Sequence, residues 1–182
     1  MFSKRRSLLL GLTALTLGLA ACASKPELSR IQDPDADFHA YRSFAVLPGR
    51  PDGSSSLVER RLIAAARLQM ERRGYVLDES APDLLVNVAA VLEDRQRLRP
   101  AAADAPGKEA VVTEEYRLGR LAVDLIDARR RDVVWHSTAE GRVSAEMLRD
   151  AGTAAEKAVA AVFESFPVKP KARVAASAPA SR

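Results

Sequence analysis

Hydrophobic residues recur at helical spacing in two stretches of the chain. In the first, Ser56 and Glu59 have the spacing of a capping box, and Gly74 stands where a helix would end. The apolar positions of this stretch are Val58, Leu62, Ala65, Ala66 and Met70. In the second, Thr153 and Glu156 have the same capping spacing. Its apolar positions, which a proline follows, are Ala155, Ala158, Val159, Val162, Phe163 and Phe166. The pattern predicts two amphipathic helices.

Runs rich in β-branched and aromatic residues predict strands around these helices. The predicted strands are residues 42–47, 75–79, 83–94, 114–127 and 132–143. The last two are joined by a short connection in which Asp127 can open a turn, so we expect an antiparallel hairpin. Residues 95–110 interrupt the pattern with proline, alanine and mixed charge, which predicts a mobile loop.

The order of these elements predicts the fold class. A strand, a helix, a run of strands and a final helix are typical of an α+β protein. The predicted architecture is a small antiparallel sheet with two helices packed on one face, a two-layer sandwich. A chain of about 140 residues can bury close to 70% of its unfolded surface, which is enough for a stable core.

The first 22 residues have the layout of a secretory signal. Lys4, Arg5 and Arg6 form a basic start, residues 8–19 form an uncharged core, and small residues precede Cys22. The core is shorter than the roughly 20 residues that cross a bilayer, so a permanent membrane span is the weaker interpretation. Cys22 is the only cysteine, which excludes an internal disulfide.

The sequence LAAC, residues 19–22, resembles the lipobox of bacterial lipoproteins. The resemblance implies that the Cys22 thiol receives a diacylglyceryl group, that cleavage occurs before it, and that the new amino terminus is acylated. Several acyl chains would anchor the protein durably in a membrane. Ala23 and Ser24 follow instead of the aspartate that retains such lipoproteins in the inner membrane. We therefore expect attachment to the outer membrane of a Gram-negative host, with the domain facing the periplasm. The alternative is an ordinary signal peptide with a chance cysteine.

These features divide the chain into four parts. They are a signal peptide (1–21), an acylated N-terminus and tether (22–30), an α+β periplasmic domain (31–168) and a disordered basic tail rich in alanine and proline (169–182). Removing the signal peptide lowers the net charge from +4 to +1, because 25 basic and 24 acidic residues remain. This weak charge, together with export, argues against nucleic acid as a partner.

Three motifs carry a resemblance to a known family. They are DPDADFHAYRSFAVLP, then ERRGY followed by APDLLVNV, and finally LAVDLIDARRRDVVWHSTAEGRV with a helix that closes at FESFP. Over about residues 28–168 the chain resembles bacterial lipoproteins of the domain of unknown function 4136 family. That family often carries a Gly- and Tyr-rich insertion where this chain has residues 95–110. The family has no established reaction, so the resemblance implies an envelope lipoprotein and no enzyme chemistry.

Few residues point to metal binding or catalysis. Asp33, Asp35 and Asp37 alternate like the start of a calcium loop, but glycine and glutamate are missing from the positions that such a loop needs. We therefore expect these carboxylates to form turns. His39 and His136 are the only histidines, and alternation should place His136 on the opposite face of its strand from the neighbouring tryptophan. No motif indicates a metal site, a cofactor or a catalytic residue.

Arg129, Arg130 and Arg131 crowd the tip of the predicted hairpin. Guanidinium groups pair well with phosphates and carboxylates, so these residues could contact an anionic envelope partner. The alternative is a solvated turn.

The sequence as a whole predicts a non-enzymatic lipoprotein that binds or scaffolds an envelope protein or the cell wall. One alternative is a carrier or sensor of a lipid or small apolar ligand held between helices and sheet. A hydrolase is a third possibility, which would require a histidine to meet a carboxylate and a serine in a cleft.

Overall fold

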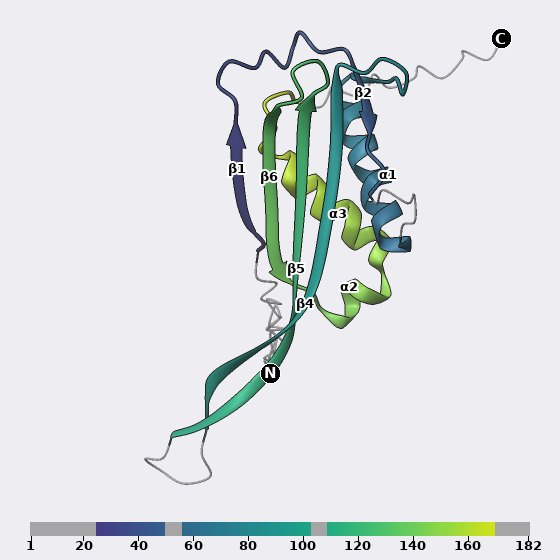
Figure 1. Ribbon diagram of the computed structural model, residues 1–182. Coiled ribbons are helices and arrows are strands. Elements are labelled where there is room, and N and C mark those ends of the chain that lie inside the picture. Colours follow the sequence, from purple (N-terminus) through teal and green to yellow (C-terminus); the bar gives the residue numbers. More distant parts are fainter. Residues whose placement is uncertain (1–24, 50–55, 103–108, 170–182) are drawn as a thin grey trace, which may run out of the picture.

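The computed structural model describes residues 25–49, 56–102 and 109–169, and it places them in one sheet with helices on a single face (Figure 1). The strands are β1 (Glu27–Gln32), β2 (Ser43–Val46), β3 (Val76–Leu77), β4 (Leu84–Ala102), β5 (Glu109–Asp127) and β6 (Val133–Arg142). The helices within these ranges are α1 (Leu57–Arg72), α2 (Ala145–Arg149) and α3 (Ala151–Phe163). The strand order across the sheet is β1-β6-β5-β4-β2-β3.

The ends of α1 are as predicted. The Ser56 side chain accepts a hydrogen bond from the Glu59 backbone N–H at 3.1 Å, and the Glu59 carboxylate accepts one from the Ser56 N–H at 3.3 Å. Gly74 has φ 90°, a left-handed conformation that glycine adopts without steric penalty. Helix α3 begins earlier than predicted, because Asp150, and not Thr153, is the N-cap and accepts from the Thr153 N–H at 3.2 Å.

The predicted small antiparallel sheet with two helices is wrong. The sheet has six strands and is mixed, because β2 pairs in parallel with both β3 and β4. Parallel neighbours need a crossover connection, and α1 provides it between β2 and β3. A third helix, the short α2, precedes α3 within the described residues. The sheet also begins earlier than expected, since β1 starts at Glu27, inside the predicted tether, and pairs with β6.

The predicted loop at 95–110 is also wrong for residues 95–102 and 109–110, whereas residues 103–108 lie outside the described residues. Strands β4 and β5 continue their pairing through to Ala102 and Glu109, well past the last β6 pair at Leu118. We call this two-stranded extension, Glu93–Ala102 paired with Glu109–Leu118, the arm. Ion pairs between the two strands stabilise the arm where it is surrounded by solvent. One example is Arg97 Nε with Glu114 Oε2 at 2.7 Å.

Helices α1 and α3 pack side by side on one face of the sheet, and no described helix covers its other face (Figure 1). Side chains that alternate along β4, β5 and β6 meet the apolar stripes of both helices, and this layer is the core. Its largest fully buried members are Trp135, Phe44, Phe163, Phe166, Met70, Leu84 and Leu125. Val58, predicted in the α1 stripe, is 45% exposed at the start of the helix.

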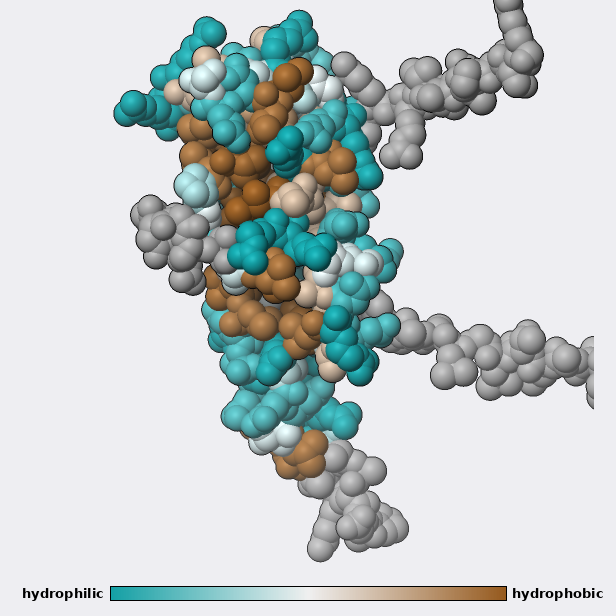
Figure 2. Space-filling model, turned by 90° about the vertical axis from the view of Figure 1, so that its right-hand side faces the viewer, coloured by the Kyte–Doolittle hydropathy of each residue, from teal (hydrophilic) through white to brown (hydrophobic). Residues whose placement is uncertain are grey.

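The edge of the molecule that carries α1 and β2 exposes a broad hydrophobic area interrupted by polar groups (Figure 2). Exposed apolar side chains there include those of Leu57, Leu68 and Val76. Hydrophilic surface follows toward the arm, and hydrophobic surface returns near its far end (Figure 2).

Candidate functional site

The candidate site is the β5–β6 turn, which lies at the end of the sheet opposite the arm. Asp127 ends β5, and three arginines follow it. Segments distant in sequence converge on this turn. We call the group the turn cluster; its members are Asp33, Tyr41, Asp83, Asp127, Arg129 and Arg130.

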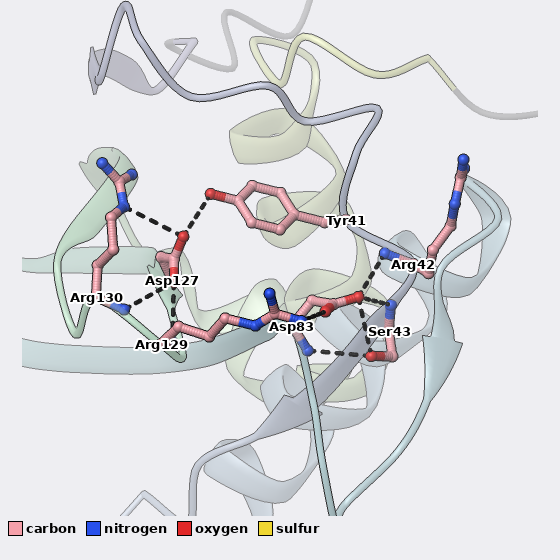
Figure 3. A network of polar contacts seen from close by, with 7 residues as sticks. All are labelled: Tyr41, Arg42, Ser43, Asp83, Asp127, Arg129 and Arg130. Atoms are coloured by element: carbon pink, nitrogen blue, oxygen red, sulfur yellow. Dashed lines mark hydrogen bonds and ion pairs between the residues drawn. The ribbon is translucent and has the colours of Figure 1, made fainter.

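Asp127 organises the turn, as the sequence predicted. Its Oδ1 accepts hydrogen bonds from the backbone N–H groups of Arg129 and Arg130, both at 2.9 Å (Figure 3). Its Oδ2 accepts from the Tyr41 hydroxyl at 2.9 Å and from Arg130 Nε at 3.2 Å. Burial acts to raise the pKa of this carboxyl, but the hydrogen bonds outweigh it and hold the pKa below its usual value.

Arg130 points back onto the protein. Its guanidinium bonds the Asp33 carboxylate at 3.0 Å and the Asp127 carboxylate at 3.2 Å. These two contacts raise the pKa of Arg130 above its usual value. Arg130 is therefore used within the fold, tying the segment after β1 to the turn.

Asp83 ties β2 to β4 beside the turn. Its Oδ2 accepts from the Arg42 N–H at 2.8 Å, the Ser43 N–H at 3.1 Å and the Ser43 hydroxyl at 3.2 Å (Figure 3). The bond from the Arg42 backbone is the main reason that the pKa of Asp83 is lowered. Arg129 Nη2 lies 3.8 Å from Asp83 Oδ1, a loose contact.

Arg129 and Arg131 face the solvent. The Arg129 side chain is 88% exposed, although its backbone is fixed by Asp127. Arg131 is exposed and has φ 61°, in the left-handed region that disfavours residues with a side chain. The turn therefore presents two guanidinium groups on a defined backbone. Because Asp33, Asp83 and Asp127 lie among the three arginines, the local charge is close to balanced.

We predict that Arg131→Gly keeps or raises the melting temperature. Glycine removes a left-handed penalty of about 1–2 kcal/mol and adds an entropic cost of roughly 0.5–1 kcal/mol. Thermal unfolding followed by circular dichroism measures the difference. A clear loss of stability would show that the Arg131 side chain supports the fold and is not simply presented to solvent.

We also predict that the protein loses stability in acid through the turn cluster. The pKa values of Asp33, Asp83 and Asp127 are lowered in the folded state, for Asp33 chiefly by the Asp35 backbone N–H. The stabilisation is complete above the unfolded pKa of about 3.9 and is lost as the pH falls through the lower folded values. In melting curves between neutral pH and about pH 3, Asp127→Asn should show a smaller drop than wild type. An equal drop in both would contradict the role of Asp127.

Asp33 and Asp37 each accept a hydrogen bond from the backbone N–H two residues further along the chain, at 2.9 Å, so they form turns as predicted.

His136 lies on the face opposite Trp135, and its Nδ1 is 2.5 Å from Asp124 Oδ1. Asn87 donates to the second oxygen of Asp124 at 2.9 Å. In the described ranges no group of three metal-binding side chains is found.

Asp83, Tyr41 and Asp124 were not predicted from the sequence as partners of the candidate residues. Asp83 directly precedes a buried strand, a position that could have marked it as a link between strands. The Asp124–His136 pair follows from the β5–β6 register, in which these residues are opposite each other. Cys22, the predicted lipid attachment site, lies outside the described residues.

The layer between helices and sheet is closely packed. Phe44, Trp135, Val159, Phe163 and Phe166 are all fully buried there. Two surface hollows are found elsewhere, one between α1 and α3 at Leu68 and Lys157, the other between the arm and α2 at Gln96 and Leu148. The apolar groove that a carrier would need is therefore not found between these layers within the described residues.

Among the residues described, no helix has the length and apolar character to cross a bilayer.

Comparisons with known proteins place this architecture in a family. The family model described as a domain of unknown function, DUF4136, matches residues 29–168. A comparison with curated proteins gives no match. Among solved structures, the chain is similar to a DUF4136 family protein from Bacteroides thetaiotaomicron. The two are 16% identical with a TM-score of 0.55, over 79% of this chain and 97% of that chain.

Two further structures are more distant. A PDZ domain protein from Parabacteroides distasonis is 14% identical, with a TM-score of 0.46, over 79% of this chain and 36% of that one. This chain thus spans about a third of that protein's length. The PelC dodecamer from Paraburkholderia phytofirmans is 12% identical, with a TM-score of 0.47, over 81% of this chain and 99% of that chain. The likeness to the Bacteroides protein shows a shared fold, and because the family model covers most of the chain, this protein belongs to the DUF4136 family.

Proposed function

We propose that this protein is a lipid-anchored envelope protein with a non-enzymatic binding role. Cys22 in the sequence LAAC carries the lipid, and Ala23 and Ser24 direct the protein to the outer membrane. The domain then faces the periplasm and binds an anionic partner, an envelope protein or the cell wall.

The binding role rests on one observation: the side chains of Arg129 and Arg131 are exposed on a turn whose backbone is fixed. Asp127 fixes the backbone of the turn, so only the side chain, and not the backbone, has to be ordered when an exposed guanidinium meets a carboxylate or phosphate. Arg131 keeps a strained backbone conformation with a long cationic side chain where glycine would fit more easily. This combination favours contact with a partner over a purely structural turn.

The position of the turn also suits this role. Strand β5 runs from the arm to the turn, whereas the chain enters the sheet through β1 at the arm's end. A lipid on Cys22 would therefore hold the opposite end of the sheet, and the arginines would point away from the membrane.

An in-cell crosslink tests the proposal. The acylated protein is crosslinked, purified and examined by mass spectrometry, in parallel with a variant carrying Arg129→Gln and Arg131→Asn. We expect a discrete protein or cell-wall adduct in wild type and its loss in the variant. Arg149→Gln, which removes an exposed arginine on α2, is the matched control and should keep the adduct. Equal adducts in both arginine variants, or a co-purified small lipid with no adduct, would contradict the proposal.

A further inference from the structure

The arm is a second feature that the turn cluster does not explain. Beyond Leu118 it consists of two strands only, and it extends for about 30 Å at roughly 3.3 Å per residue. An isolated hairpin of this kind is marginally stable in water unless side chains on its faces support it. Most of its described length is polar, with ion pairs such as Asp94–Arg117 across the strands.

The outer part of the arm exposes hydrophobic side chains. Leu98 is 72% exposed and Val111 is 64% exposed. Leu98 and Pro100 share one face because they are two residues apart, and Val111 is opposite Pro100 in the register. We call these three residues the arm tip. On the other face of the same strand lie Arg95, Arg97 and Arg99.

The chain that leads to Cys22 leaves the domain at the base of this arm. Pro26 lies against Gly141, so close that a Cβ placed on Gly141 would be 3.5 Å from the Pro26 Cα. Gly141 is paired with Gly119, one residue from the start of the arm. Because β1 runs antiparallel to β6, its first residue, Glu27, lies at the end of the sheet from which the arm extends (Figure 1).

The tether between Cys22 and the domain is shorter than the arm, and this comparison indicates what the arm contacts. Cys22 precedes Pro26 by four residues, so a fully extended tether spans at most about 14 Å. The arm is about twice as long and leaves from the same end of the sheet. An arm that stood upright would keep Cys22 from reaching the bilayer, so the arm has to incline toward the surface of the bilayer that holds the Cys22 lipid, and the arm tip then lies against that surface.

We propose that the arm tip docks on the phospholipid bilayer that holds the lipid of Cys22; this rests on the lipid anchor of the proposed function. Leu98, Pro100 and Val111 enter the boundary between headgroups and acyl chains, while Arg99 on the other face remains at the phosphates. Arg95 and Arg97 on that face are held in ion pairs with Glu93 and Glu114. Helix α2, beside the base of the arm, adds Met147 and Leu148, which are 39% and 38% exposed (Figure 1). Deep insertion is excluded, because the free edges of a two-stranded ribbon would leave backbone groups unpaired in hydrocarbon.

The lone cysteine makes a direct test practical. Acylation uses Cys22, so Leu98→Cys carries the only free thiol of the mature chain, to which a polarity-sensitive fluorophore is attached. The labelled, acylated protein is placed in vesicles of phosphatidylethanolamine and phosphatidylglycerol with brominated acyl chains. Glu79→Cys, in the exposed loop between β3 and β4 at the far end of the sheet, is the matched control. Val111→Cys serves as a second label position.

We expect a blue shift and quenching by the brominated chains at Leu98→Cys and Val111→Cys, and neither effect at Glu79→Cys. Labels that stay unquenched on protein whose acylation is verified by mass spectrometry would overturn the docking of the arm tip and leave the anchor intact. A blue shift without quenching that depends on protein concentration would also overturn it, in favour of a contact between proteins. A mature chain without acyl groups on Cys22 would overturn the anchor and the docking together.

Discussion

Phe163→Ala is expected to lower the free energy of unfolding by about 3–5 kcal/mol. The Phe163 ring is fully buried at the end of α3, with its centroid 5.5 Å from Trp135 and 5.9 Å from Phe166. Removing the ring leaves a cavity that neither neighbour can fill without leaving its own contacts. Chemical denaturation at neutral pH measures the change.

Leu68→Ala is the control for this substitution. Leu68 lies on α1 and is 39% exposed, so its truncation removes little buried area and should cost less than about 1 kcal/mol. Equal stability of Phe163→Ala and wild type would mean that α3 does not pack on the sheet through this face.

Arg73→Ala is the second substitution with a large expected effect, about 3 kcal/mol. Arg73 is only 6% exposed and bonds the Gln69 carbonyl at 2.9 Å and the Phe163 carbonyl at 2.8 Å. It thus caps the C-terminal ends of both long helices, where a cation is favoured by the helix dipole. Burial lowers the pKa of Arg73 below its usual value, because the charged form is partly removed from water.

Two further variants separate the charge of Arg73 from its geometry. Arg73→Lys keeps a cation, but a single ammonium cannot reproduce the planar fork that bonds both helices, so we expect an intermediate loss. Arg72→Ala removes an exposed neighbour and should cost less than about 1 kcal/mol. If Arg73→Ala costs no more than Arg72→Ala, the buried guanidinium does not hold the helices together.

Arg73 and Phe163 should also be coupled. The guanidinium carbon lies 5.1 Å from the centre of the Phe163 ring. Residues in contact give non-additive effects, so the double variant should lose less stability than the sum of the two single variants.

The helices could be predicted from the sequence because their signals are local. The capping pair at Ser56 and Glu59 and the apolar stripe of α1 both depend on spacing within one segment. Helix α3 shows the limit of that evidence. Asp150 and Thr153 both have capping side chains, and only the turn made by α2 decides that Asp150 takes the position.

The mixed sheet could not be predicted in the same way. Phe44 pairs with Leu77 on one side and Leu84 on the other, and both pairings are parallel. Strand β3 is only two residues long, so no periodic pattern shows its direction. The direction of β3 depends on where the chain re-enters the sheet after α1. That position is set by how α1 packs on the core.

The arm was missed for another reason. Residues 95–99 alternate arginine with glutamine and leucine, so one face of the segment is fully charged and the other lacks the continuous apolar pattern that predicts a strand. Pairing with β5 stabilises it through long-range partners such as Glu114 for Arg97 and Glu115 for Gln96. Pro100 fits because β4 has an open edge at that point.

The candidate site could be predicted in part. Asp127 and the three arginines were found because a turn and its charges are adjacent in sequence. That Arg130 is held by Asp33 and Asp127, while Arg129 and Arg131 stay exposed, depends on contacts over long sequence distances. From composition alone, the paired arginine cannot be distinguished from the two exposed ones.

The most direct test of the proposed function is the chemistry of Cys22. Cells that express wild type or Cys22→Ser are labelled with a radioactive fatty acid, and the protein is then fractionated with the membranes and weighed by mass spectrometry. Lipid anchoring predicts a labelled, membrane-bound mature chain that begins at Cys22, and an unlabelled precursor for Cys22→Ser. Normal labelling and membrane attachment of Cys22→Ser would contradict the anchor, and with it the orientation of the turn and the docking of the arm tip.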